Sequence, residues 1–295
     1  GSFYAFCIWI GLGVLSLYEL FNKYVNAKVS AVAATAVCMV VPGILAAENW
    51  DDHDRSNRYT ARDFAANYLN SCAPNAIIFT NGDNDTFPLW YCQEVEGIRT
   101  DVRVVNLSLL NTDWYIDQMK RKAYGSDPVP FTLKQEQYVQ GTRDVVYVMP
   151  DERLKGFVDV KQVMEFVASD DPRTKYNANG DMLAILPTRM LKFDVDSALV
   201  VKNGVVPDKY KSRIVKEIQW QIKGGHVVKN QLMVLDLIAH NDWSRPIYFA
   251  ITVGSENYFG MEEYFRQEGL AYRLVPYKSE STDGQEGEID SDIMY

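Results

Sequence analysis

The chain opens with two long uncharged stretches separated by a short polar connection. Residues 3–18 and 29–47 contain no charged side chain, whereas the connection between them carries Lys23 and Lys28. The second stretch is about long enough to cross a bilayer, which requires roughly 20 apolar residues in a helix. We therefore predict a transmembrane helical hairpin over residues 1–49. The alternative is a buried hairpin of a soluble protein, which the glycines and proline in these stretches disfavour.

The same connection predicts the orientation of the hairpin. Short loops that carry lysine and arginine stay in the cytoplasm, so Lys23 and Lys28 place the connection there. Everything after Trp50 is then expected on the extracytoplasmic side of the membrane. The opening Gly1-Ser2 resembles a cloning remnant, so we expect the natural chain to extend further toward its N terminus.

Helical and strand-like patterns alternate after the hairpin. Apolar residues recur at helical spacing from Ala61 to Leu69, and Asp54 or Ser56 can cap the start of this helix. The alternation of strands and helices with short connections predicts a parallel sheet with crossover helices. We expect a soluble α/β domain over residues 50–278 with a mostly parallel, Rossmann-like sheet. The next elements are a strand at 75–82, a helix at 86–98, a strand at 101–110 and a helix at 112–125.

The middle of the domain is less regular, and the alternating order returns near its end. An Asn-Gly step between apolar runs predicts a hairpin or tight turn at 198–207. Residues 279–295 are polar and acidic and predict a disordered linker or tail. The remaining elements are strands at 143–150, 181–196 and 216–224, a helix at 158–171, a helix at 229–241, a strand at 245–253, a helix at 261–269 and a strand at 271–277.

Composition narrows the function classes. The formal net charge of the chain is -9 and there is no basic block, which excludes nucleic acid as a partner. The chain has no Walker loop, nucleophile elbow or dinucleotide fingerprint. Cys72 and Cys92 can form a disulfide if the domain is extracytoplasmic, or they are buried free thiols.

Polar residues follow the predicted strands where a ligand cleft would lie. In open parallel sheets ligands bind beyond the carboxyl ends of the strands. A candidate cleft is therefore predicted from residues after the first and second strands and from the later Asn-Asp step. Its residues are Asn81, Asp83, Asn84, Asp85, Asn111, Asp113 and Asp242.

Asp83 and Asp85 have two alternative roles. Two aspartates one residue apart can hold a divalent metal on a nucleotide-sugar diphosphate, because hard cations prefer carboxylate oxygens. Alternatively, Asp85 or Thr86 caps the following helix, with Pro88 in its first turn and Gly82 in a positive-φ turn. A cap needs Asp85 only, so both roles can hold together.

Charged and aromatic residues near the membrane exit and in the loops suggest further contacts. Arg55, Arg58 and Arg62 are spaced to share one helical face, which can bind a lipid-linked phosphate or lipid headgroups. The alternative is pairing with the neighbouring aspartates at 51, 52, 54 and 63. The run at 51–54, three acids around a histidine, is either a metal site or a solvated membrane edge. Trp114 and Trp243 can stack on a sugar ring or lie partly in the core.

Two long segments carry a family resemblance. Residues 49–119 and 232–276 closely resemble a family of large bacterial membrane proteins, long catalogued as a domain of unknown function. That family is now grouped with a transmembrane protein O-mannosyltransferase of the animal secretory pathway. The resemblance implies a GT-C-type glycosyltransferase, a polyprenyl-phosphate sugar donor, an acceptor protein and an inner-membrane location with the domain on the periplasmic side. It also implies that the catalytic carboxylate lies in an early extracytoplasmic loop outside this chain.

Three functions are consistent with these features. The first is an accessory domain of a membrane glycosyltransferase, with membrane lipid, the lipid-linked donor and the acceptor protein as partners. The second is an independent metal-dependent domain that binds a sugar or nucleotide through Asp83 and Asp85. The third is a non-catalytic envelope scaffold. The resemblance favours the first.

Overall fold

The structure is a computed structural model that describes residues 1–279 and 287–291. It divides into two compact units, Gly1–Arg58 and Tyr59–Tyr295. We call the first the hairpin unit and the second the α/β unit, and each is described by itself.

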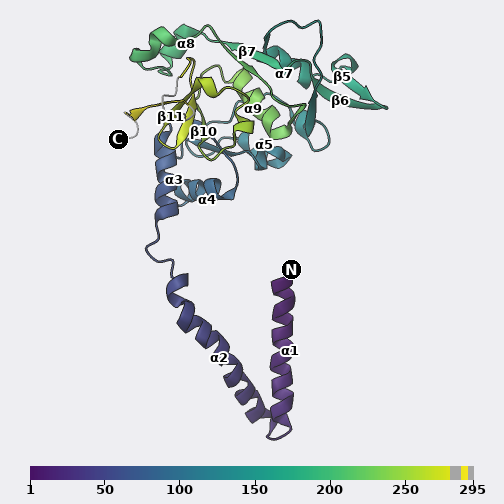
Figure 1. Cartoon of the computed structure of the whole chain (residues 1–295), viewed down its shortest axis with the longest axis vertical. Helices are drawn as coiled ribbons and strands as arrows, with labels where there is room; N and C mark the ends of the chain where they lie inside the picture. The colour runs from purple at the N-terminus through teal and green to yellow at the C-terminus, as the bar shows by residue number, and fades with distance from the viewer. Residues whose placement is uncertain (280–286, 292–295) are drawn as a thin grey trace. The chain divides into compact units, whose positions relative to one another are not determined.

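The hairpin unit consists of two helices joined by a four-residue turn. Helix α1 spans Ser2–Asn22 and α2 spans Ala27–His53 (Figure 1). The side chain of Asn26 caps α2 by accepting the N–H of Val29 at 3.0 Å. Both helices are long and apolar enough to cross a membrane. Their length and composition agree with the predicted transmembrane hairpin and indicate membrane association.

Within its described residues, the α/β unit contains three sheets and a set of mostly short helices. Its α-helices are α3 (Thr60–Ser71), α4 (Asp83–Glu94), α5 (Asp113–Met119), α6 (Gln135–Tyr138), α7 (Val160–Ala168), α8 (Ser197–Lys202) and α9 (Lys229–His240). Its strands are β1 (Ile77–Thr80), β2 (Arg103–Asn106), β3 (Val145–Val148), β4 (Val158–Asp159), β5 (Lys175–Ala178), β6 (Asp181–Leu186), β7 (Met190–Asp194), β8 (Glu217–Gln221), β9 (His226–Val228), β10 (Ile247–Ala250), β11 (Phe265–Glu268), β12 (Ala271–Leu274) and β13 (Glu288–Ile289).

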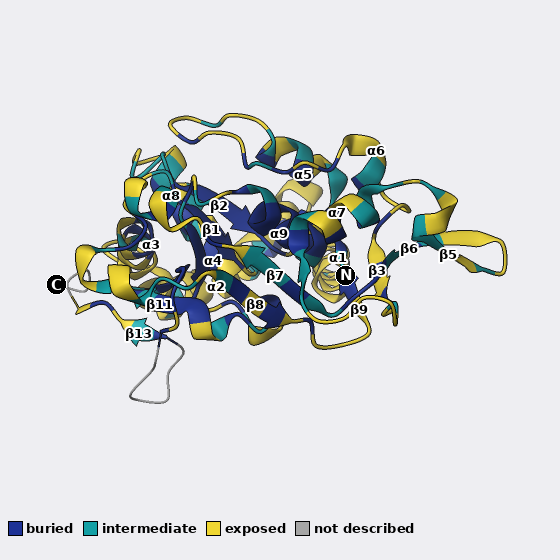
Figure 2. Ribbon diagram, turned by 90° about the horizontal axis from the view of Figure 1, so that it is seen from above, coloured by how far each residue is buried: buried dark blue, intermediate teal, exposed yellow. Residues whose placement is uncertain are grey.

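The six-stranded central sheet has the order β13-β11-β12-β10-β1-β2. Strands β10, β1 and β2 are parallel, and every residue in them is buried, which in β1 and β2 appears as dark blue in Figure 2. Burial explains the mainly apolar sequences of β1 and β10. Strand β12 runs antiparallel to both β10 and β11. The sheet is therefore mixed, and the expected Rossmann-like character is not confirmed; the α/β class is.

Two smaller sheets complete the unit. One has the order β5-β6-β3-β9 and the other β4-β7-β8. The half-exposed strand predicted at 216–224 is confirmed, because β8 alternates between buried and more exposed positions. The long helix predicted at 229–241 is confirmed as α9, whose middle is buried on all sides.

One predicted element is wrong and one is confirmed in part. At 198–207 the tight turn is confirmed at Asn203-Gly204, where Gly204 has a φ of 64°. The hairpin alternative is wrong, because Asp196 accepts the N–H groups of Ala198 and Leu199 and so starts helix α8. The helix predicted at 261–269 is a short 3-10 turn followed by strand β11. A strand places Arg266 and Glu268 on the same face, where they form a buried ion pair.

The acidic C-terminal segment is partly structured. Residues 280–286 and 292–295 of the predicted tail lie outside the described residues. Disorder is the wrong prediction for Glu288–Ile289, which pairs with β11 as strand β13. Arg213 holds the Glu288 carboxylate at 2.8 Å, and buried Arg266 lies 3.6 Å from that of Asp290. Arginines from distant segments thus neutralise these acids, which local composition alone could not show.

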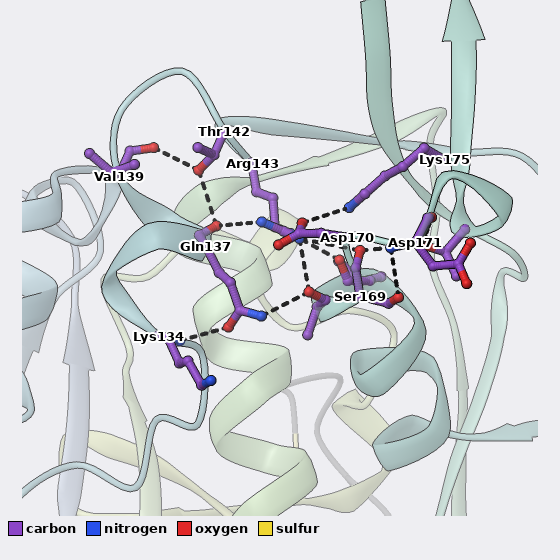
Figure 3. Close-up of polar contacts among 12 residues, drawn as sticks. Lys134, Gln137, Val139, Thr142, Arg143, Ser169, Asp170, Asp171 and Lys175 are labelled. Carbon is purple, nitrogen blue, oxygen red and sulfur yellow. Dashed lines mark hydrogen bonds and ion pairs between the residues drawn. The ribbon is translucent and has the colours of Figure 1, made fainter.

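A buried arginine, Arg143, also connects segments next to the smaller sheets. The guanidinium of Arg143 donates to the carbonyls of Gln137 and Val167 and pairs with Asp170 at 2.7 Å (Figure 3). Lys175 at the start of β5 approaches the same carboxylate at 3.6 Å. Arg143 therefore joins α6 to the end of α7, and the carboxylate of Asp170 links both to the start of β5.

The cysteines of the α/β unit are free thiols. Cys72 and Cys92 are both buried and do not form a disulfide. Burial raises the pKa of each thiol above its ordinary value, so both stay protonated and unreactive at neutral pH.

Candidate functional site

The carboxyl edge of the central sheet carries part of the predicted cleft. Where β1 ends, Asn81, Asp83 and Asn84 are exposed, whereas Asp85 is buried. Gly82 has a φ of 91°, which lets the chain turn sharply from β1 into α4. The positive-φ turn predicted at this glycine is therefore confirmed.

A hydrogen-bond network behind this turn holds it in place. The hydroxyl of Thr86 donates to the carbonyl of Gly82 at 2.7 Å and lies 2.8 Å from the hydroxyl of Thr80. The side-chain amide of Asn106, at the end of β2, donates to the Thr86 hydroxyl at 2.8 Å. The polar groups of Thr86 and Asn106 are thus used within the fold and are not free for a ligand.

Asp85 links the turn to the neighbouring strand. It is the third residue of α4, and the residue before the helix is Gly82, so the expectation that Asp85 caps the helix is wrong. Its carboxylate instead accepts the hydroxyl of Thr252, two residues after β10, and lies 3.4 Å from the N–H of Asn81. The carboxylate therefore joins the exits of two parallel strands.

Asn111 and Asp113, from the loop after β2, also serve local structure. Asn111 accepts the N–H of Asn230 at 3.1 Å, and Asp113 accepts the N–H of Trp114 at 2.8 Å. Across the described ranges, no three histidine, cysteine or acidic side chains gather as a metal site would require. This holds for the run at 51–54 as well. A metal on Asp83 and Asp85 stays a prediction, supported by two carboxylates only.

Asp242 does not belong to this cleft. It precedes β10, which is parallel to β1, so it lies at the amino edge of these strands and not at their carboxyl edge. Its carboxylate forms an ion pair with Lys161 at 2.7 Å. The similar texture of the two Asn-Asp segments misled the prediction, because one follows its strand and the other precedes it.

The predicted arginine row is not formed on one helix. Helix α2 ends at His53 and α3 begins at Thr60, so Arg55 and Arg58 lie in the segment between these two helices. Arg62 lies in α3 and pairs with Glu96 at 2.7 Å. The helical spacing was misleading because the side chain of Asp54 accepts the N–H of Ser56 and favours a turn there. Binding of phosphate or headgroups by these arginines stays a prediction.

A cavity at the amino edge contains the most chemically distinctive group of residues in the described part of the chain. It has a volume of about 230 Å³ and lies between β10 and the three-stranded sheet. Trp243 is half-buried and packs against Phe193 of β7, with ring centroids 5.6 Å apart. The other apolar residues that line the cavity are Val205, Ile238, Ala239, Pro246, Ile247 and Leu274.

Charged groups surround this aromatic wall. Asp242 and Asp194 are exposed at the cavity, and Lys161, the second residue of α7, pairs with Asp242. Asp159 also lines it and caps α7 by accepting the N–H of Lys161 at 2.7 Å. A cavity with one apolar aromatic face and carboxylates at its rim can hold a small ligand that is apolar on one side and rich in hydroxyl groups at its edges.

The backbone at the cavity is held in an uncommon conformation. Asp242 and Trp243 both have positive φ, 44° and 56°. Such a conformation is unfavourable for a bulky side chain such as tryptophan and persists only where the surrounding structure enforces it. The turn is closed by the side chain of buried Asn241, which donates to the carbonyl of Arg245 at 2.8 Å and accepts its N–H at 3.3 Å.

Sequence reasoning found only part of this cavity. It identified Trp243 as an aromatic that can stack on a sugar and Asp242 as a candidate ligand, but it grouped Asp242 with the wrong edge. Phe193, Asp194 and Lys161 were missed, because they are tens of residues from Trp243 and no local pattern connects them. Trp114 is half exposed at the start of α5, outside the cavity.

His240 lies beside the cavity, between Ala239 and Asn241 of its lining. Its titration is expected to make the stability of the fold depend on pH. Its Nδ1 lies 3.1 Å from the buried carboxylate of Asp236, and this hydrogen bond raises the pKa of His240 above 6.5. Protonation then stabilises the fold below pH 6.5, and the contribution is lost as the pH rises through the raised pKa. We expect His240→Gln to lower stability below pH 6.5 and to have less effect above the raised pKa.

Denaturant titration of the full chain in neutral detergent, followed by tryptophan fluorescence at pH values on both sides of this window, measures the effect. His226→Gln is the matched control, because His226 is exposed on β9. A difference between wild type and His240→Gln that does not change with pH would contradict the prediction.

Comparison with known proteins identifies relatives. A family model described as TMEM260-associated domain 2 matches residues 61–293, which is most of the chain. A curated relative, protein O-mannosyl-transferase TMEM260 of Mus musculus, is 32% identical over 77 residues. That alignment covers 26% of this chain and 11% of the mouse protein. No solved structure matches the chain significantly.

Proposed function

This chain belongs to the family of the TMEM260-associated domain 2, which relates it to O-mannosyltransferase-like membrane proteins. From that premise we propose that it is the membrane-anchored accessory part of a glycosyltransferase, and that its α/β unit binds a carbohydrate in the Trp243 cavity. The carbohydrate belongs to the acceptor protein or to a lipid-linked donor. Lys23 in the hairpin turn and Lys28 at the start of α2 favour an extracytoplasmic position for the α/β unit.

The aromatic and carboxylate lining of the cavity is the observation that carries this proposal. A pyranose ring presents C–H groups on one face, which pack against an indole, and hydroxyls at its edge, which donate to carboxylates. Trp243 supplies the indole, and Asp194 and Asp242 supply the carboxylates. The volume of about 230 Å³ is below the roughly 300–1,000 Å³ of drug-sized sites and so suits one sugar unit.

The metal-dependent alternative has less support. It requires the carboxylates of Asp83 and Asp85 to converge on one ion, but Asp85 is committed to Thr252. No third acidic, cysteine or histidine side chain joins them within residues 1–279 and 287–291.

Trp243→Ala tests the proposal. We expect the full chain in neutral detergent to bind methyl α-mannoside, and Trp243→Ala to weaken binding about fivefold, since loss of one stacked ring costs on the order of 1 kcal/mol. Saturation-transfer NMR detects the bound sugar and a titration gives the dissociation constant.

Trp114→Ala is the matched control, because Trp114 is another tryptophan that can stack on a sugar and lies outside the cavity. The affinity of Trp114→Ala for methyl α-mannoside should equal that of wild type. The carbohydrate site would be rejected if wild type bound none of a panel of monosaccharides, or if both tryptophan variants lost affinity equally. Asp242→Asn, at an exposed position, should weaken binding without loss of stability.

A further inference from the structure

Arg103 is a buried cation on the edge strand β2. The residue is 5% exposed, and its Nη2 donates to the carbonyls of Gln118 and Arg121, both at 2.7 Å. Its Nε and Nη1 are buried and have no hydrogen-bond partner among the described residues. Unpaired buried donors are costly, roughly 1–3 kcal/mol each, so this arrangement requires an explanation.

The other buried arginines of the described chain show how unusual this is. Arg143 pairs with Asp170, and all three nitrogens of Arg245 donate to oxygen atoms of neighbouring loops. Within the described residues, two nitrogens of Arg103 have no hydrogen-bond partner, and its side chain forms no ion pair. The two remaining buried arginines, Arg266 and Arg273, both pair with Glu268.

A pocket of about 500 Å³ lies beside Arg103, between α4, β2 and α5. Arg121 and Lys122 are exposed at its rim, and Trp90, Tyr115 and Tyr124 form aromatic parts of its wall. The one acid of its lining, Glu94, accepts the hydroxyl of Tyr124. Three cations against one carboxylate leave the pocket with two positive charges.

We propose that this pocket binds a phosphorylated small molecule, with the phosphate held between Arg103 and the rim cations and the organic part against the aromatic wall. A phosphomonoester carries about -1.5 to -2 charges at pH 7, which matches the excess charge of the lining. Guanidinium groups suit phosphate oxygens because they present several donors in one plane. The volume exceeds that of phosphate alone, so the ligand carries an organic group. This site is separate from the Trp243 cavity and does not depend on the carbohydrate proposal.

Arg103→Gln tests the site, because glutamine can still donate to the neighbouring carbonyls but carries no charge. In the full chain in neutral detergent, calorimetry with glucose 1-phosphate should show binding that Arg103→Gln weakens at least about tenfold, as expected for loss of a charge-assisted hydrogen bond. The double variant Arg121→Ala, Lys122→Ala changes exposed side chains only, so it should stay folded even if Arg103→Gln does not. It should also weaken binding several-fold.

Lys155→Ala, an exposed lysine outside the pocket, is the control and should bind as wild type does. A second titration with dihexanoyl phosphatidic acid distinguishes a soluble phosphate ester from a lipid headgroup, and pocket-dependent binding of either supports the proposal. Equal affinity of wild type and the Arg121→Ala, Lys122→Ala variant for both ligands would overturn it. So would no binding of either ligand to wild type.

Discussion

Replacing Arg245 by methionine is expected to lower the free energy of unfolding of the α/β unit by about 4 kcal/mol. The guanidinium donates to the carbonyls of Asn75, Asp127 and Pro128 and to the hydroxyl of Ser126. Methionine fills a similar volume but donates nothing, and each buried acceptor left unsatisfied costs roughly 1–3 kcal/mol. Denaturant titration of the full chain in neutral detergent measures the change.

The control for this variant is Arg153→Met, because Arg153 is 89% exposed and pairs only with Asp151 at the surface. It should leave stability unchanged. Burial and the proximity of Arg103 lower the pKa of Arg245 to about 10, which still leaves it charged at neutral pH. If Arg245→Met were as stable as wild type, the guanidinium would not be what joins the loops before β1 and β10.

Glu268→Gln should cost about 3–5 kcal/mol of stability, the range for removing one partner of a buried ion pair. Glu268 is fully buried, and its carboxylate forms ion pairs with two buried arginines, Arg266 and Arg273. The nitrogen of Arg273 lies 3.3 Å from the carboxylate oxygen. It also accepts the hydroxyl of Tyr248. Glutamine keeps the shape but leaves the two guanidinium groups without this counter-charge.

Thermal and denaturant unfolding of Glu268→Gln and of Glu263→Gln separate the buried ion pair from a surface one. Glu263 pairs with Lys278 where both side chains are more than half exposed, so its replacement should have little effect. Similar small effects of the two variants would show that Arg266 and Arg273 do not depend on Glu268.

The order of the central elements could be predicted from the sequence. Strands β1, β2 and β10 follow from largely apolar runs, α4 follows from the turn residues that precede it, and α9 follows from its length. Residues 261–269 were assigned to a helix because four or five residues do not distinguish a helix from a strand by pattern. Pairing of β11 with β12 decides between them.

Some site residues could likewise be identified from the sequence, and others could not. Trp243 and Asp83 could be identified as candidates by their residue types and their positions next to strands. The partners of Trp243 could not, because Phe193 and Lys161 reach it only through the packing of separate sheets. Asp242 precedes its strand in the sequence, and the parallel pairing of β10 with β1 places it at the amino edge.

Local sequence therefore determines the two apolar helices, the α/β class and the family signature, because each depends on spacing between near neighbours. Only the tertiary structure decides which acids are bound within the fold, which tryptophan lines a cavity and which buried arginine has two nitrogens without a hydrogen-bond partner among the described residues. These properties depend on contacts between residues far apart in the chain. Arg103 shows this, since a strand residue between valines becomes a candidate phosphate ligand only where α4 and α5 form a pocket beside it.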